Sequence, residues 1–180
     1  RLETKFARFG EALSLGAGEV IEGYASLFGA PDQGKDIVTR GAYAASLAAH
    51  HSRGSKVKML WQHDPTRPIG VWDVVAEDGH GLKVSGRVLP DVQAGREALA
   101  LLKAGAVDGL SIGYRTIRSE KAGKNSRLLH EIELWEVSLV TFPMLAQARV
   151  RATDGGGADE DAALAETLAS TFRAARDMLA

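Results

Sequence analysis

Short runs of alternating apolar and polar residues fill the first 150 positions of the chain. Such alternation places one side of a strand in a core and the other in solvent, so it indicates half-buried β-strands. Strands are predicted at residues 4–9, 19–28, 36–39, 56–61, 69–76, 82–89, 110–117 and 128–141. We therefore expect a protein of about seven or eight strands.

Two helices interrupt these strands. Residues 41–51 are rich in alanine, and Tyr43 and Leu47 are four positions apart, which is typical of one helical face. A second helix is predicted to open at Pro90-Asp91, with Asp91 as N-cap, and to end at Gly105.

The connections favour hairpins. Glu77-Asp78-Gly79-His80-Gly81 is a hairpin signal, Pro65 and Pro68 predict a turn after Trp61, and residues 119–126 read as a charged loop. A sheet built from hairpins is mostly antiparallel, and a closed or half-closed barrel hides its edges. The predicted fold is α+β, mostly β: an antiparallel, roughly seven-stranded barrel flanked by helices.

The last 27 residues differ from the rest. Residues 154–157 (Asp-Gly-Gly-Gly) are typical of a linker, and residues 158–180 carry an apolar stripe at helical spacing. We predict a domain over 1–153, with its motifs in 19–150, followed by this linker and an amphipathic C-terminal helix. That helix could pack on its own barrel, form a dimer contact or dock onto a larger assembly.

Composition removes several classes of function. A formal net charge of −1 argues against direct nucleic-acid binding through phosphates, and no apolar run approaches the length of a membrane span. The first ten residues lack an apolar segment, so no signal peptide is expected. The absence of cysteine excludes disulfides, thiolate catalysis and cysteine zinc sites. We expect neither a metal nor a cofactor.

Ser111 is the first candidate for chemistry. It lies in the strand Leu110–Ile117 beside Gly113, whose missing side chain leaves room for a peptide backbone. Arg115 shares the parity of Ser111 and is a candidate for the substrate or oxyanion vicinity. Serines are also common in strands without any catalytic role.

Two further candidates are polar side chains next to, or within, apolar strands. His63 follows an apolar strand at a turn, a place from which a rigid scaffold presents a side chain to a site. Glu136 is the one charge in the nearly all-apolar half of its strand, and a buried carboxylate needs a partner. That partner could be a histidine, giving a Ser–His–Glu arrangement, or an arginine such as Arg115 or Arg149.

Four motifs, in this order, resemble the prohead maturation proteases of tailed bacteriophages. They are Trp61-Gln62-His63-Asp64, Pro68-Ile69-Gly70, Gly109-Leu110-Ser111-Ile112-Gly113-Tyr114 and the run Glu136 to Pro143 (EVSLVTFP), with Gly23–Gly29 (GYASLFG) as a further match. The resemblance covers roughly residues 19–150.

This resemblance implies a fold like that of the herpesvirus assembly protease and a serine endopeptidase activity. Members of the family work inside the immature capsid, in the host cytoplasm. They cut the scaffold, or the scaffolding segment of the major capsid protein, and then themselves. The portal is a further candidate partner, and the chain is expected to act as a homodimer or assembly-dependent oligomer. Its source could be a phage, a prophage or a gene transfer agent.

By position in these motifs, Ser111 is the nucleophile and His63 the general base. The herpesvirus enzymes use a second histidine as third member. Here Glu136 falls at about the corresponding place, and His130 is its rival. Glu136 is preferred because a carboxylate fixes the imidazole tautomer and stabilises the imidazolium.

Three alternatives stay open at this stage. The chain could be a catalytically silent capsid-assembly protein on the same fold. It could be a metal-dependent hydrolase using His63 and Asp64 with further histidines, although no HExxH spacing supports this. It could also be a binding module that acts through its C-terminal helix.

Overall fold

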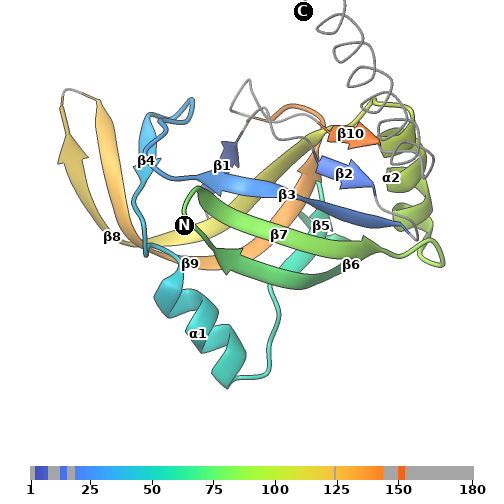
Figure 1. Cartoon of the computed structure of the whole chain (residues 1–180), viewed down its shortest axis with the longest axis horizontal. Helices are drawn as coiled ribbons and strands as arrows, with labels where there is room; N and C mark the ends of the chain where they lie inside the picture. The colour runs from blue at the N-terminus through green and yellow to red at the C-terminus, as the bar shows by residue number, and fades with distance from the viewer. Residues whose placement is uncertain (1–2, 8–12, 16–18, 124, 144–149, 153–180) are drawn as a thin grey trace, which may run out of the picture.

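The protein is a single curled β-sheet with two helices, seen in a computed structural model that describes residues 3–7, 13–15, 19–123, 125–143 and 150–152 (Figure 1). The strands are β1 (Glu3–Ala7), β2 (Leu13–Leu15), β3 (Val20–Leu27), β4 (Asp36–Val38), β5 (Lys58–Trp61), β6 (Asp64–Glu77), β7 (Gly81–Val88), β8 (Gly109–Ala122), β9 (Ser126–Val140) and β10 (Val150–Ala152). The helices are α1 (Ala44–Ser52) and α2 (Gln93–Lys103). The mostly-β prediction is confirmed.

The strands follow the order β1-β8-β9-β5-β6-β7-β3-β2-β10, and β4 pairs with β9 beside this path. Most neighbours are antiparallel, as predicted, but β5 and β4 run parallel to β9, and β10 runs parallel to β2. The sheet is a half-barrel, with β1 and β10 as the ends of its hydrogen-bonded path among the described residues. All eight predicted strands are present, and the short strands β2 and β10 are additional.

Three local predictions were wrong. The predicted loop at residues 119–126 is instead the tip of a long hairpin, because β8 continues to Ala122 and β9 begins at Ser126. β6 starts at Asp64 and contains both prolines, which lie where register shifts interrupt its pairing with β5. The N-cap of α2 is Val92, not Asp91, and makes no side-chain cap bond. The helix stop at Gly105 is confirmed, with φ of +69°.

One continuous core fills the inside of the curled sheet. It is built mainly from the inward residues of the strands and the buried side of α2, with Ala42 and Tyr43 added from the turn before α1. Its largest fully buried members are Tyr43, Tyr114, Ile21, Met59, Ile69, Leu82, Leu102, Ile112, Leu129, Ile132 and Leu134. Burying each large apolar side chain is worth about 1.5–3 kcal/mol. Near the site, the buried Trp72 indole N–H donates to the Val137 carbonyl at 3.2 Å, so β6 is tied across the core to β9.

Arg127 and Asp36 fix β4 against β9. The guanidinium donates to both carboxylate oxygens, at 2.8 and 2.6 Å, and Asp36 is buried. A bidentate pair of this kind sets geometry as well as energy.

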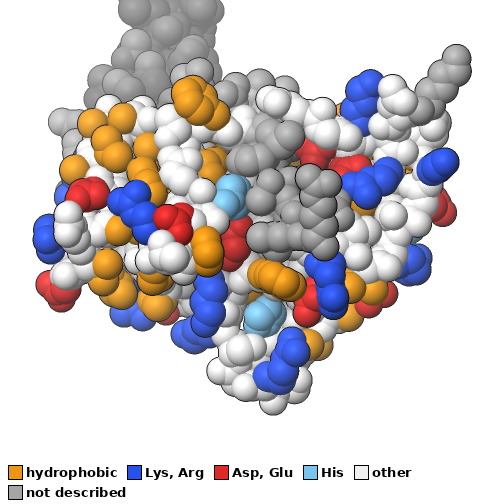
Figure 2. Space-filling model, turned by 180° about the vertical axis from the view of Figure 1, so that it is seen from behind, with side chains coloured by type: hydrophobic (Ala, Val, Ile, Leu, Met, Phe, Trp, Pro, Cys, Tyr) orange, Lys and Arg blue, Asp and Glu red, His pale blue; other side chains and the backbone are white. Residues whose placement is uncertain are grey.

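The surface shows mixed charge, as the composition predicts. In Figure 2, which views the molecule from behind, basic and acidic side chains are interspersed among hydrophobic ones. Within the described part of the chain, no helix is long and apolar enough to cross a membrane. The predicted linker at 154–157 and the predicted helix at 158–180 lie outside the described residues.

Candidate active site

A buried polar patch lies on one face of the β8–β9 pair. Ser111 is directly opposite Ser138, and Gly113 is directly opposite Glu136. Residues two apart on a strand share a face, and so do opposite residues of an antiparallel pair, so these four positions form one square. Ser111 and Ser138 have no exposed surface, and Glu136 is 5% exposed.

His63 reaches this patch from a tight turn. Trp61 pairs with Asp64, so Gln62 and His63 are the two central residues between β5 and β6. Their φ angles are +53° and +61°, the left-handed pattern of a type I′ turn. Non-glycine residues adopt this region at a cost of order 1–3 kcal/mol each, which the surroundings must offset.

The end of β9 holds this strained turn. The Gln62 N–H donates to the Leu139 carbonyl at 2.9 Å, and the Gln62 side-chain amide donates to the Thr141 hydroxyl at 2.6 Å. The His63 N–H donates to the Ser138 hydroxyl oxygen at 3.1 Å. Gln62 and the His63 backbone therefore hold the turn against the end of β9.

Ser111, His63 and Glu136 form a continuous hydrogen-bonded chain. His63 Nε2 lies 2.6 Å from Ser111 Oγ, and His63 Nδ1 lies 2.5 Å from Glu136 Oε1. An ionised carboxylate only accepts, so Nδ1 carries the proton, and Nε2 is free to accept the serine hydroxyl proton. The histidine side chain is 16% exposed and the glutamate side chain 6%, so water screens the pair weakly.

Ser138 completes the network and was not singled out from the sequence. Its hydroxyl donates to Glu136 Oε2 at 2.6 Å while accepting the His63 backbone N–H. One side chain thus fixes both the carboxylate and the turn that carries the imidazole. Its spacing of two residues from Glu136 was the available signal, because it places both on one face.

Gly113 has a different role from the expected one. A Cβ on this residue would lie 2.0 Å from Glu136 Oε1, closer than any real contact. The room beside Ser111 that was assigned to a substrate backbone therefore holds the Glu136 carboxylate. Only glycine allows the carboxylate to cross over β8 and reach His63.

The other predicted site residues lie elsewhere. Arg115 forms an ion pair with Glu133 at 2.8 Å and is about 13 Å along β8 from Ser111. His130 contacts Glu120 and the Thr39 hydroxyl, each at 3.3 Å, about 20 Å along β9 from Glu136. The structure thus brings Glu136, and not His130, to His63. Arg149, the alternative partner of Glu136, lies outside the described residues.

The metal-hydrolase alternative relies on Asp64 beside His63, together with further histidines. Among the described residues, no group of three or more histidine, aspartate or glutamate side chains is placed to hold an ion. Asp64, the acid next to His63, instead accepts hydrogen bonds from the Thr66 hydroxyl and backbone N–H at 2.6 and 2.9 Å. These two bonds lower the pKa of the Asp64 carboxyl.

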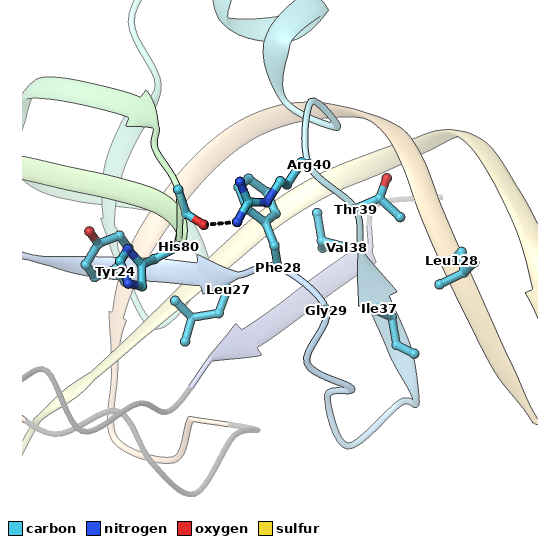
Figure 3. Close-up of a pocket in the computed structure, with 11 residues that line it drawn as sticks. Tyr24, Leu27, Phe28, Gly29, Ile37, Val38, Thr39, Arg40, His80 and Leu128 are labelled. Carbon is cyan, nitrogen blue, oxygen red and sulfur yellow. Dashed lines mark hydrogen bonds between the residues drawn. The ribbon is translucent and has the colours of Figure 1, made fainter.

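A separate cavity of about 690 Å³ opens between the end of β3, β4, the β6–β7 turn and β9 (Figure 3). Its lining is mostly apolar and includes Leu27, Phe28, Val38 and Leu128. Arg40 crosses it to donate to the Gly79 carbonyl at 2.6 Å. Ser111, His63 and Glu136 are not among its lining residues, so the cavity is distinct from the hydrogen-bonded chain.

Two curated phage proteins are similar to this chain in sequence. The chain is 34% identical over 136 residues to the prohead protease of Enterobacteria phage HK97, a match that covers 74% of this chain and 59% of that protein. It is 29% identical over 156 residues to a capsid polyprotein of Pseudomonas phage PAJU2, covering 81% of this chain and 21% of the relative. The chain thus spans about three fifths of the first relative and a fifth of the second.

Among solved structures, the bacteriophage T4 capsid assembly protease matches with a TM-score of 0.64 at 15% identity. This match covers 79% of the chain and 98% of that structure, and it shows a shared fold. The model of the Caudovirus prohead serine protease family matches residues 10–159. These residues include every element of the hydrogen-bonded chain, and the protein therefore belongs to the Caudovirus prohead serine protease family.

Proposed function

We propose that this chain is a serine endopeptidase that cleaves a capsid protein, or its scaffolding segment, during procapsid maturation. The observation that carries the proposal is the hydrogen-bonded chain from Glu136 through His63 to Ser111. The base lies within hydrogen-bond reach of the hydroxyl and is itself oriented by a third group, which is the arrangement that activates a hydroxyl. Membership of the prohead protease family supports the assignment.

The proposed mechanism uses the geometry of this hydrogen-bonded chain. His63 Nε2 takes the proton of Ser111 Oγ as the oxygen attacks a peptide carbonyl, and Glu136 stabilises the imidazolium that forms. The imidazolium then gives its proton to the leaving amine, and an acyl-enzyme remains. Water, activated by the same imidazole, hydrolyses the ester and restores Ser111.

The capsid setting comes from the relatives. One of them is named a capsid polyprotein and another a prohead protease. We propose the major capsid protein as substrate, the procapsid interior as place of action and self-cleavage as a second reaction. Activation by dimerisation or assembly belongs to the same proposal.

The test is mass spectrometry of the full chain co-expressed with the capsid protein from the same genome. The wild type should give defined cleavage products, and Ser111→Ala should give none. Glu136→Gln should lose most of the cleavage, and His130→Ala should keep it. Cleavage that persists in Ser111→Ala would overturn the nucleophile assignment, and the reverse result at 136 and 130 would make His130 the third member.

One observation favours a second candidate, a catalytically silent assembly protein. Ser111 has no exposed surface, whereas a working nucleophile must meet its substrate. A fluorophosphonate probe separates the two candidates when applied to the co-expressed complex. Labelling at Ser111 supports the peptidase, and a complex with intact capsid protein and no label supports the silent protein.

A further inference from the structure

The edge of β9 that faces away from β8 is covered by different elements along its length. β4 pairs with residues 127–129 on this edge, and β5 pairs with residues 136–139. Within the described part of the chain, no strand pairs with residues 130–135 there. This gap lies directly before Glu136, and α1, which follows β4 and precedes β5 in the sequence, packs against β9 (Figure 1).

Side chains of α1 take the place of a paired strand in this gap. The Leu134 N–H donates to the Ser46 hydroxyl oxygen at 2.9 Å. His50 Nε2 lies 2.9 Å from the Leu134 carbonyl oxygen, which can only accept, so Nε2 carries the proton. In the neutral ring, Nδ1 then accepts from the Ser55 hydroxyl at 2.8 Å. Two side chains one helical turn apart thus hold both backbone groups of Leu134, which is fully buried.

Leu134 is the last residue before a β-bulge. It pairs with Tyr114, whereas Glu136 pairs with the preceding residue of β8, Gly113. Trp135 is therefore an extra residue that lies opposite no residue of β8. The bulge thus lies between the residue that α1 holds and the carboxylate of the active site.

The bulge turns Glu136 to the face of the sheet that carries the active site. Leu134 before the bulge and Val137 after it both belong to the core, although they are three residues apart. Strict alternation from Leu134 would have pointed Glu136 into the core, away from Ser111. Because of the extra residue, Glu136 instead shares the face of Ser111 and meets His63 there.

We propose that Ser46 and His50 are positioning residues for the active site. By holding both backbone groups of Leu134, they fix the strand where the bulge begins, and with it the direction of the Glu136 side chain. β-Bulges next to active sites commonly direct a side chain in this way. That the direction of Glu136 affects the reaction rate rests on the proposed function.

Removing the His50 side chain has a calculable consequence. It leaves the buried Leu134 carbonyl without its donor, so the bulge loses one of its two attachments to α1. A displacement of about 1 Å in a catalytic group costs about 100-fold in rate, so a partly loosened carboxylate should cost about tenfold. The loss should fall on kcat, because Glu136 acts on the imidazole and not on the substrate.

The test compares His50→Ala with His50→Gln in the full chain. The glutamine amide N–H can replace the donor of His50 Nε2, so this conservative variant should restore most of the activity. His51→Ala is the matched control, because it removes the neighbouring, exposed histidine of the same helix. Arg127→Met is the control for stability alone, because it weakens the other end of β9.

NMR and hydrogen exchange provide readouts that do not depend on catalysis. In His50→Ala, the downfield signal of the His63 Nδ1 proton should broaden or disappear, and the amides of residues 134–136 should exchange about tenfold faster than in His51→Ala. Arg127→Met should keep the signal under conditions where it is folded. If His50→Ala does not fold, Ser46→Ala takes its place, because it removes the acceptor of the Leu134 N–H. A signal unchanged from that of the control, or lost equally in Arg127→Met, would refute the proposal.

Kinetics then connects α1 to the reaction. With a peptide spanning the capsid cleavage site, His50→Ala should show a kcat about tenfold lower than His51→Ala and a KM within about twofold. His50→Gln should lie within about threefold of the control in kcat. If the proton signal responds but wild type never labels at Ser111 or cleaves, the positioning role stands and the proposed function fails. If wild type cleaves and His50→Ala matches His51→Ala in kcat and signal, only the positioning role fails.

Discussion

Replacing Gly113 by alanine is expected to disconnect Glu136 from His63. The added Cβ would lie 2.0 Å from Glu136 Oε1, where ordinary contacts begin at 3.4 Å. The carboxylate must therefore retreat by about 1.4 Å, or β8 must separate from β9. Since Oε1 lies 2.5 Å from His63 Nδ1, a retreat of this size breaks the hydrogen bond that orients the imidazole.

The expected loss of catalytic rate can be estimated from the effects of similar changes in other enzymes. A misplacement of about 1 Å in a catalytic group costs about 100-fold, and loss of the carboxylate's tautomer control costs up to about 10⁴-fold. We expect Gly113→Ala to lower kcat/KM by 10²–10⁴, roughly 3–5 kcal/mol in the barrier. Folding stability should fall by about 1–3 kcal/mol, because a buried carboxylate loses a partner.

Two measurements test this expectation. The first is the second-order rate constant of fluorophosphonate labelling at Ser111, and the second is the downfield NMR signal of the His63 Nδ1 proton. Gly79→Ala is the matched control, because a Cβ there meets nothing within 4 Å. The control should label at the wild-type rate. If Gly113→Ala labels as fast as the control and keeps the downfield proton signal, Gly113 is not needed to let Glu136 reach His63.

Three other substitutions test separate parts of the structure. Ser138→Ala should lower kcat about tenfold and destabilise the fold by about 1–3 kcal/mol, since two partners lose their hydrogen bond, and Ser138→Thr should restore much of the activity. Arg127→Met should cost about 2–3 kcal/mol in urea unfolding, because Asp36 is left buried without its bidentate partner, and a loss below 0.5 kcal/mol would contradict this. The Tyr24 hydroxyl and nearby backbone donors lower the pKa of Asp78 to about 2, so its contribution to stability is present above pH 4 and is lost as the pH falls through 2. The Tm difference between wild type and Asp78→Asn should therefore vanish near pH 2, and a difference that grows on acidification would reverse the assigned sign.

Much of the fold follows from local pattern, and the exceptions have physical causes. Most core strands are rich in apolar residues or alternate apolar with polar positions over part of their length, so they were visible in the sequence. The tip of the β8–β9 hairpin was not, because residues 118–121 are exposed and polar on both faces, and only cross-strand pairing makes them a strand. Strands β2 and β10 have three residues each, too few to show a period.

The site was partly visible for a different reason. Glu136 stood out as a charge in an apolar strand, and the resemblance to a known family supplied the roles of Ser111 and His63. The positive φ angles of Gln62 and His63 could not be predicted from the sequence, because this turn has no glycine to indicate a left-handed backbone. The turn holds its shape through contacts with β9, which local propensity does not register.

Sheet topology explains why three distant residues meet. β5 runs parallel to β9, so both strands terminate at the same end of the sheet. The turn after β5 therefore lies beside the last residues of β9. β8 runs antiparallel to β9, so the first residues of β8, including Ser111, lie at that end of the sheet as well. A one-residue slip between β8 and β9 would turn Ser111 to the opposite face from Glu136. The register shifts between these strands all lie beyond Gly113. The square formed by Ser111, Gly113, Glu136 and Ser138 therefore keeps the alignment that the hydrogen-bonded chain needs.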